Sequence, residues 1–320
     1  QSGGTDSLSG HMAASNPAPR PLPETVWAIL ACPGCGGPLE RTPSGPRCAA
    51  CGIDYGPAET GQPDLRLRRS RPFSLDGILE VPFSPEGGMD FQPLPPRSAP
   101  EVDLTRFPGP CHLPMDLRTW LPRAARPGSL ALDLGCGTQV HQEVCEYAGY
   151  EYVGLDYADP AALLLGDGQA LPFRDGSFDF ILSIAVFEHI PNPLLAMREA
   201  HRVLKPGGIF LGTIAFQEPF HSNSFFHHSH LGTLHALRFG GFQVHRVAPS
   251  EPFWSALDAL ANMGLFAGSP RWLARLLVSP LRPLHRLWWW AGRKVRPDAT
   301  ERNRILKNSG AVLFLASKAE

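Results

Sequence analysis

Two apolar segments separated by a glycine turn constrain the fold of this chain more than any other feature. The first, 130–134, is followed by Gly135 and Gly137, and the second, 152–155, ends at Asp156. Glycine has no Cβ, so a turn built from it can bend tightly and let a ligand reach the main chain. A carboxylate after the next strand can accept hydrogen bonds from ribose hydroxyls. The unit predicts a nucleotide site, although the glycine pair alone fits an ordinary turn equally well.

Four further motifs follow in a fixed order along the chain. They occupy residues 167–173, 176–183, 186–189 and 203–208. In that order and spacing they resemble the class I S-adenosylmethionine (SAM) methyltransferases, in particular the group that includes the ubiquinone-biosynthesis enzymes. The resemblance runs from about residue 130 to 247. It implies an enzyme that binds SAM and transfers its methyl group.

The resemblance implies a role for individual residues around the cofactor. The residues that match its cofactor-binding positions are Asp133, Gly135 and Gly137 around the methionine part, Asp156 at the ribose, Asp167 and Gly168 at the adenine, and Ser183 under the sulfonium. Tyr157, next to Asp156, is also included in the cofactor site. Gln139 departs from the family, whose members usually have a third glycine there. Its side chain could replace a water near the SAM carboxylate or narrow the pocket. We still expect SAM binding and include Gln139 in the site.

Histidines after the predicted fourth and fifth strands are candidate general bases. His189, His221 and His228 fall on the rim where the methyl group is expected, and a neutral imidazole can accept the proton of an attacking hydroxyl or amine. Each also has a packing or capping interpretation, and Ser229 is the expected helix cap in this segment. Because the sulfonium is already activated, alignment alone could suffice. A second metal site here is disfavoured, since residues 225–230 contain no carboxylate or cysteine.

Four of the seven cysteines form two CxxC pairs. Cys32 and Cys35 make the first pair, and Cys48 and Cys51 the second, with glycine nearby in both cases. This spacing is typical of a tetrahedral zinc ribbon. Two disulfides are disfavoured in a reducing compartment, and two pairs without a βαβ context disfavour a redox motif. A closed four-thiolate site has no open coordination position, so we expect structural Zn²⁺.

The residues around these cysteines carry a second resemblance. Segments 27–33, 37–39, 51–56 and 61–65 are similar to the small zinc module of the methyltransferase-activator family, which occurs as a separate activating subunit and fused ahead of methyltransferase domains. Residues 13–67 are assigned to this module. A module this small binds metal because it buries too little apolar surface alone.

Alternating helices and strands predict the rest of the architecture. Helices are expected over 113–124, 140–147 and 193–204, the last capped by Asn192. Strands are expected over 130–134, 152–156, 162–166, 178–183 and 208–214, with a sixth strand opening at 241–242 and an antiparallel seventh at 311–317. The fold class is therefore α/β, with a Rossmann-like, seven-stranded, mostly parallel sheet and helices on both faces. The core is assigned to 111–250 and 309–320.

Two segments lie outside this core. Residues 68–110 are rich in proline, glycine and serine, with apolar islands, and are interpreted as an arm over the methyltransferase face or a partly disordered tether. Residues 251–308 form a helical insertion with Trp254, Trp272 and the triplet 288–290 among many arginines. It could be a lid over the substrate pocket, a membrane-surface helix through 271–296, an RNA contact, or a helical cap with buried tryptophans. We rank the lid first.

Composition limits the alternatives. The chain has 320 residues, 43% hydrophobic, and a formal net charge of −1, which gives no global signal for a polyanion. Residues 1–12 are interpreted as an expression-vector remnant, and no uninterrupted apolar run is long enough to span a membrane, so the cytoplasm is the default location. We expect methylation of a small or medium-sized biosynthetic metabolite. An RNA methyltransferase is the second choice, and a SAM-binding protein without methyl transfer is the third; no DNA partner is expected.

Overall fold

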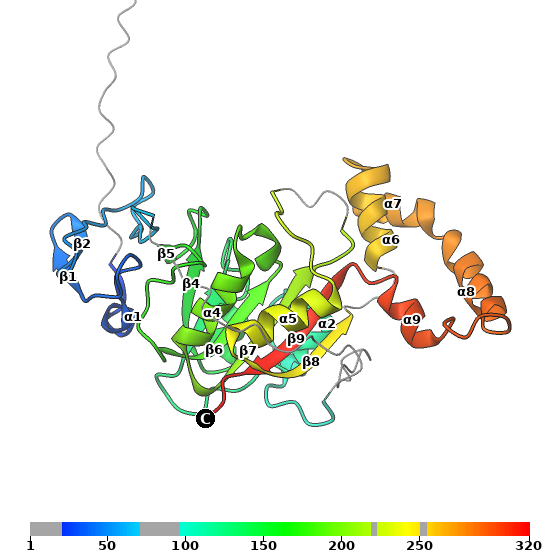
Figure 1. The fold of residues 1–320 in the computed structure, drawn as a ribbon, viewed down its shortest axis with the longest axis horizontal. Helices are drawn as coiled ribbons and strands as arrows, with labels where there is room; N and C mark the ends of the chain where they lie inside the picture. The colour runs from blue at the N-terminus through cyan, green and yellow to red at the C-terminus, as the bar shows by residue number, and fades with distance from the viewer. Residues whose placement is uncertain (1–20, 71–96, 219–222, 250–254) are drawn as a thin grey trace, which may run out of the picture.

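A mixed β-sheet organises the chain (Figure 1). The computed structural model describes residues 21–70, 97–218, 223–249 and 255–320, and within them the main sheet has seven strands. They are β3 (Leu130–Leu134), β4 (Glu151–Asp156), β5 (Leu164–Leu165), β6 (Phe178–Ile184), β7 (Leu204–Ala215), β8 (Gln243–Pro249) and β9 (Ala311–Ser317). The predicted vector remnant and His221 lie outside the described residues.

The strand order contains one reversal. The sheet runs β5-β4-β3-β6-β7-β9-β8, and β3 pairs in parallel with both β4 and β6. The chain moves outward from β3 to one edge and then returns to continue beyond β6, so the order reverses between β3 and β6. Ligands of such sheets bind at the carboxyl ends of the strands beside this reversal. The last strand, β9, inserts antiparallel between β7 and β8, as predicted.

Helices cover both faces of the sheet because strand residues alternate between two hydrophobic clusters. Leu130, Leu132 and Leu134 pack in the cluster that contains buried residues of α4 (Pro193–Val203) and α5 (His230–Gly240). Ala131 packs in the opposite cluster with α2 (Met115–Arg118) and α3 (Gln142–Tyr147). The predicted fold class is confirmed.

Strand β7 is longer than the expected 208–214, since it begins at Leu204, and two predicted elements are much shorter than expected. The expected helix over 113–124 is only α2, preceded by Pro114 and ended at Thr119. Pro122 has no backbone N–H and disfavours helical geometry at Leu121, so the helix cannot continue. The expected strand over 162–166 is reduced to the two residues of β5. Short 3₁₀ helices, η1 (Leu104–Arg106) and η2 (Phe187–His189), occur outside these elements.

The N-terminal module has one short helix and a hairpin. Helix α1 (Glu24–Ile29) is followed by β1 (Leu39–Thr42) and β2 (Gly45–Cys48), which pair antiparallel. Val26, Leu30 and Tyr55 are buried and belong to the same hydrophobic cluster as the main sheet. The module therefore shares a core with the larger unit.

The C-terminal insertion is helical and extends from one end of the sheet (Figure 1). It contains α6 (Ser255–Ala259), the π-helical segment η3 (Leu260–Leu265), α7 (Arg271–Val278), α8 (Leu281–Gly292) and α9 (Glu301–Leu306). Pro270 and Pro280 directly precede α7 and α8, whereas Pro283, which we also expected to interrupt a helix, lies in the first turn of α8, where proline is tolerated. In the described part of the chain, no helix is both long and apolar enough to cross a bilayer.

Candidate functional sites: a cysteine cluster and a glycine turn

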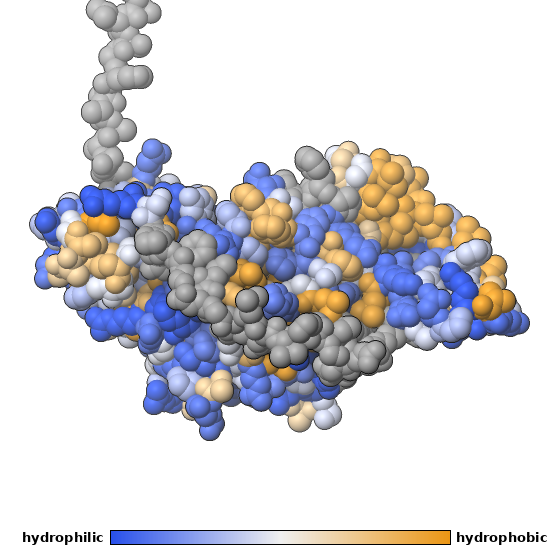
Figure 2. Space-filling view, in the orientation of Figure 1, coloured by the Kyte–Doolittle hydropathy of each residue, from blue (hydrophilic) through white to orange (hydrophobic). Residues whose placement is uncertain are grey.

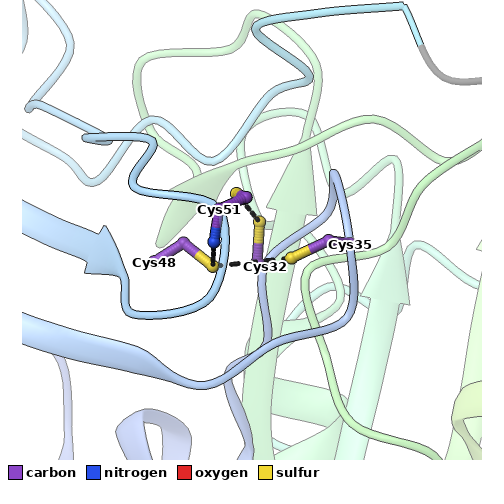
Figure 3. A group of neighbouring side chains, drawn as sticks. All are labelled: Cys32, Cys35, Cys48 and Cys51. Carbon is purple, nitrogen blue, oxygen red and sulfur yellow. Dashed lines mark hydrogen bonds between the residues drawn. The ribbon is translucent and has the colours of Figure 1, made fainter.

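The four predicted metal ligands come together in the N-terminal module (Figure 3). Cys32 and Cys35 follow α1, Cys48 ends β2, and Cys51 lies in the next turn. Their sulfur atoms all lie within 4.8 Å of one another, with 3.5 Å between those of Cys35 and Cys48 and 3.7 Å between those of Cys32 and Cys51. Thiolates at about 2.3 Å from one tetrahedral ion would be separated by about 3.8 Å. The donor set and its spacing therefore fit Zn²⁺.

Local backbone geometry supports this cluster. Burial favours the neutral thiol of Cys48, but backbone N–H groups, led by that of Cys51, point at its sulfur, and the net effect lowers its pKa to about 7. A Cβ on Gly37 would lie 2.8 Å from the Cβ of Ala50 and 3.2 Å from the sulfur of Cys35. Glycine is needed at position 37 because the loop that carries Cys32 and Cys35 packs closely against the loop that carries Cys48 and Cys51.

Main-chain hydrogen bonds join the cysteine module to the sheet. Leu65 donates its N–H to the carbonyl of Leu165 at 2.8 Å, and Leu165 donates to Pro63 at 2.9 Å, which extends the sheet in parallel beyond β5. On the other side of the module, Ala31 donates to Pro172 and Arg174 donates to Ile29. The metal-ligand loops and the sheet are thus held in one orientation.

The predicted glycine turn crosses the carboxyl end of β3. Gly135 and Gly137 have φ of 74° and 49°, a region that side chains rarely adopt. A Cβ on Gly135 would also meet the Val186 side chain at 2.4 Å, whereas a Cβ on Gly137 would meet open space. Gly135 is therefore needed for close packing against Val186, and Gly137 leaves its main chain accessible to a ligand.

Gln139 has a left-handed backbone conformation, which favours glycine. Its φ is 59°, and its side-chain amide donates to the carbonyl of Ala161. The side chain is therefore turned to the loop after β4.

Asp133 sits in a buried network at the end of β3. One carboxylate oxygen accepts a hydrogen bond from the hydroxyl of Tyr152 at 2.8 Å and lies 3.1 Å from Nδ1 of His141. Burial raises the pKa of Tyr152 far above its usual range, so the phenol stays protonated and donates. The other oxygen of Asp133 is buried without a hydrogen-bond partner in the described residues. A cationic ligand group would satisfy it.

Asp156 ends β4 and binds main-chain N–H groups. Its Oδ2 accepts from Gly137 at 3.0 Å, and its Oδ1 accepts from Ala158 and Asp159 at 2.9 and 3.0 Å. The ring of Tyr157, next in sequence, is 61% exposed. A carboxylate offers about four acceptor positions, so the three bonds leave capacity for a ligand hydroxyl.

The remaining predicted cofactor residues lie beside the turn. Asp167 accepts the N–H of Gln169 at 2.8 Å, and a Cβ on Gly168 would meet Ile190 at 3.0 Å. Ser183, near the end of β6, is fully buried, and its hydroxyl is without a hydrogen-bond partner within the described ranges. The structure gathers these side chains on the carboxyl edge between β4 and β6.

The candidate bases differ in their environments. His189 is half-buried in η2, after β6. His228 is buried, and its main-chain N–H donates to the carbonyl of Ala215 at the end of β7. Burial, together with His227, lowers the pKa of His228, so its ring is neutral near pH 7. Ser229 caps α5 by accepting the N–H of Gly232 at 3.1 Å, as predicted.

Glu188 is buried at the same edge. Its side chain accepts the N–H of Ala215 at 3.2 Å, and its carbonyl accepts the N–H groups of Phe225 and Phe226 at 2.6 and 3.2 Å. It therefore ties the segment that carries His228 to β7. The sequence alone could not show whether Glu188 positions this segment or only packs in the core, because its hydrogen-bond partners are 27 or more positions away.

Comparison with known proteins places this chain in a family. A family model described as a methyltransferase domain matches residues 132–212. A methyltransferase of Mycobacterium sp. (strain KMS) is 34% identical over 182 residues, which cover 51% of this chain and 69% of that protein. The chain belongs to the class I SAM-dependent methyltransferases. Its matched segment includes most of β3, all of β4, β5 and β6, and most of β7, and hence the glycine turn.

Other similar methyltransferases match over shorter ranges. The ubiquinone biosynthesis O-methyltransferase of Pseudomonas aeruginosa (strain UCBPP-PA14) is 33% identical over 109 residues. The match covers 29% of this chain and 47% of the relative, so the chain spans about half of that protein's length. The Mus musculus protein named "Probable tRNA methyltransferase 9B" is 39% identical over 94 residues, covering 26% of this chain and 21% of the relative. A solved complex of the Haloferax volcanii Trm112 methyltransferase activator with a methyltransferase has 19% identity and a TM-score of 0.40, covering 62% of this chain and 85% of that one.

Proposed function

We propose that this methyltransferase methylates a small or medium-sized, partly apolar biosynthetic metabolite at oxygen, nitrogen or carbon. Bound SAM supplies a methyl group already activated on a sulfonium. The protein then has to bind the cofactor, align the acceptor and, for a protic acceptor, remove a proton.

The buried oxygen of Asp133 is the observation that carries the cofactor assignment. It lies under the glycine turn, next to a hydrogen-bonded phenol and imidazole, and lacks a partner in the described residues. The ammonium of the methionine part of SAM has the charge and donors that this oxygen needs. Asp156 would accept ribose hydroxyls, Asp167 and Gly168 would bind the adenine, and Ser183 would lie below the reacting centre.

The acceptor side is supported by the environment of His228. A buried, neutral imidazole after β7 can accept a proton, and the exposed rings of Phe225 and Phe226 supply an apolar rim nearby. We therefore assign His228 as the general base in preference to His189. The acceptor would present its reacting hydroxyl, amine or acidic carbon to this edge.

We also propose that Cys32, Cys35, Cys48 and Cys51 hold a structural zinc ion. The four sulfur atoms fill a tetrahedral site, so the ion would stabilise the loops without taking part in methyl transfer.

RNA is the second candidate acceptor, favoured by the relative named as a tRNA methyltransferase and by the surplus of basic residues after Arg271. Raising salt from about 50 to 200 mM would weaken RNA binding by orders of magnitude, because RNA binding releases counterions. Binding of a small metabolite would change little.

Methyl release from labelled SAM against fractionated metabolites and total RNA tests the proposal. We expect turnover with a metabolite fraction, loss of SAM affinity in Asp133→Asn, and a lowered kcat with unchanged SAM affinity in His228→Asn. Unchanged SAM affinity in Asp133→Asn would contradict the cofactor assignment. Turnover confined to RNA would replace the proposed acceptor.

A further inference from the structure

The C-terminal insertion presents large hydrophobic side chains to solvent. Nine such residues between 271 and 296 have exposed fractions from 48% to 78%: Trp272, Leu276, Leu277, Leu281, Leu284, Leu287, Trp288, Trp290 and Val295. Figure 2 shows hydrophobic surface over α6 and α7 and again at the far end of the insertion. Clusters of exposed apolar residues of this kind mark interaction surfaces.

The exposed residues of α8 follow helical spacing. Leu281, Leu284, Trp288 and Ala291 recur every three or four residues and line a shallow hollow, together with Leu287 and His285. A stripe with this period is the apolar face of an amphipathic helix.

This face is not what holds the insertion together. Ala261, Ala274 and Val278 form a separate small core between η3 and α7. Asp258 of α6 makes ion pairs with Arg275 of α7 and Arg282 of α8, with N···O distances of 3.4 and 2.9 Å. The helices therefore pack through one side and leave the leucine and tryptophan side unpacked.

Basic residues border the exposed apolar face. From 255 to 296 the chain has seven arginines and lysines and one acidic residue, Asp258. The ammonium of Lys294 lies 4.5 Å from the ring centre of Trp290, and the guanidinium of Arg296 lies 5.6 Å from that of Trp288. Cationic heads beside tryptophan rings and leucines match the boundary between lipid headgroups and acyl chains.

We propose that residues 271–296, which we call the basic apolar face, dock on an anionic lipid bilayer. A second copy of this chain would bring one cationic surface against another, which opposes association. RNA would use the arginines and some aromatic rings but would leave the leucines exposed. An anionic bilayer satisfies both the charges and the apolar side chains, so we prefer it to the lid expected from the sequence.

Vesicle flotation of the full chain tests this inference independently of methyl transfer. Neutral phosphatidylcholine vesicles are compared with vesicles containing about a third phosphatidylglycerol. We expect binding to the anionic vesicles only, weakened by salt, with a blue shift of tryptophan emission. Each arginine removed is expected to weaken binding about fivefold. Absence of binding to anionic vesicles at low salt, or equal binding to neutral ones, would overturn the proposal.

Matched variants locate the surface. The double variant Leu284→Glu, Trp288→Glu should lose at least about tenfold in vesicle binding, since charge is costly below the headgroups. Met115→Glu, which changes a 72% exposed residue of α2, should bind as the parent does. The double variant Arg271→Glu, Arg286→Glu replaces two exposed basic residues of the same face. It tests vesicle binding through this face even if the apolar variant misfolds. Equal binding by all variants, or sedimentation showing a dimer that Trp288→Glu dissociates, would contradict docking through this face.

Discussion

The guanidinium of Arg66 lies 5.5 Å from the ring centre of Tyr157 and donates to the Tyr157 carbonyl at 3.2 Å. The two residues are 91 positions apart, one in the cysteine module and the other at the end of β4. Asp64 holds the guanidinium with two further hydrogen bonds of 2.7 and 2.8 Å. A side chain of the module therefore borders the proposed ribose site.

Replacing Arg66 should weaken SAM binding without abolishing folding. We expect Arg66→Ala to bind SAM about three- to tenfold more weakly, because one hydrogen bond and one cation–π contact at Tyr157 are lost. Isothermal calorimetry measures this. Arg68→Ala is the matched control, since Arg68 also pairs with Asp64 but, within the described residues, makes neither a hydrogen bond nor a cation–π contact with Tyr157. An equal loss of SAM affinity in both variants would mean that the effect comes from the stability of the cysteine module and not from the contact with Tyr157.

Removing the proposed ribose acceptor should weaken SAM binding more than removing Arg66. Asp156→Ala is expected to weaken SAM binding by about 1.5–3 kcal/mol, because charge-assisted hydrogen bonds are lost and the N–H of Gly137 loses its acceptor. Isothermal calorimetry with SAM measures this change in binding free energy. An unchanged affinity would show that the ribose lies elsewhere.

The cysteine cluster should bind about one zinc ion per chain, as measured by elemental analysis. Cys35→Ser should reduce the zinc content and lower the melting temperature of the whole protein, because the module and sheet share a hydrophobic core. Cys111→Ser, outside the cluster, should retain the metal. A zinc-free parent protein with an ordered module would contradict the assignment.

Gln139 offers a test of backbone strain in the turn. Gln139→Gly relieves a left-handed side-chain conformation but loses the bond to Ala161, so its stability should stay within about 1 kcal/mol of the parent. Gln139→Val loses the bond and places a β-branched residue at positive φ, and should cost about 2 kcal/mol or more. Chemical denaturation compares the two. Equal stability would show that the turn relaxes around the new residue.

Acid should destabilise the protein through His230. Burial lowers its folded-state pKa to about 4, below the unfolded value of about 6.5. The unfolded chain binds the proton first, so this contribution to stability is present above pH 6.5 and is lost as pH falls toward 4. His230→Gln should therefore flatten the decline of unfolding free energy over this range, by about 3 kcal/mol at most. His112→Gln, at an exposed position away from α5, is the matched control variant.

Local chemistry made part of this structure predictable. Asn192 accepts the N–H of Leu195 at the start of α4, and β9 lies at 311–317 as expected, because caps and apolar runs are read over a few neighbouring residues. The module's cysteines were predictable for the same reason. The helix expected over 113–124 was too long because apolar spacing outweighed Pro122 in that interpretation.

Contacts between distant segments were not accessible to the same reasoning. The pairing of Asp133 with His141 and Tyr152 depends on how α3 packs beside β3 and β4, and no local pattern encodes it. The placement of Arg66 over Tyr157 likewise depends on how the module docks. The exposure of Trp288 and Trp290 could not be inferred either, because the same residues fit a buried cap.

The pairing of Leu65 with Leu165 also determines which associations the sheet can form. An exposed edge strand is a template for another chain, and here the main-chain groups of β5 are already taken by a segment of the same polypeptide. Covalent linkage keeps the local concentration of that segment high at any expression level. A separate polypeptide would have to displace this segment in order to pair with the same edge of β5.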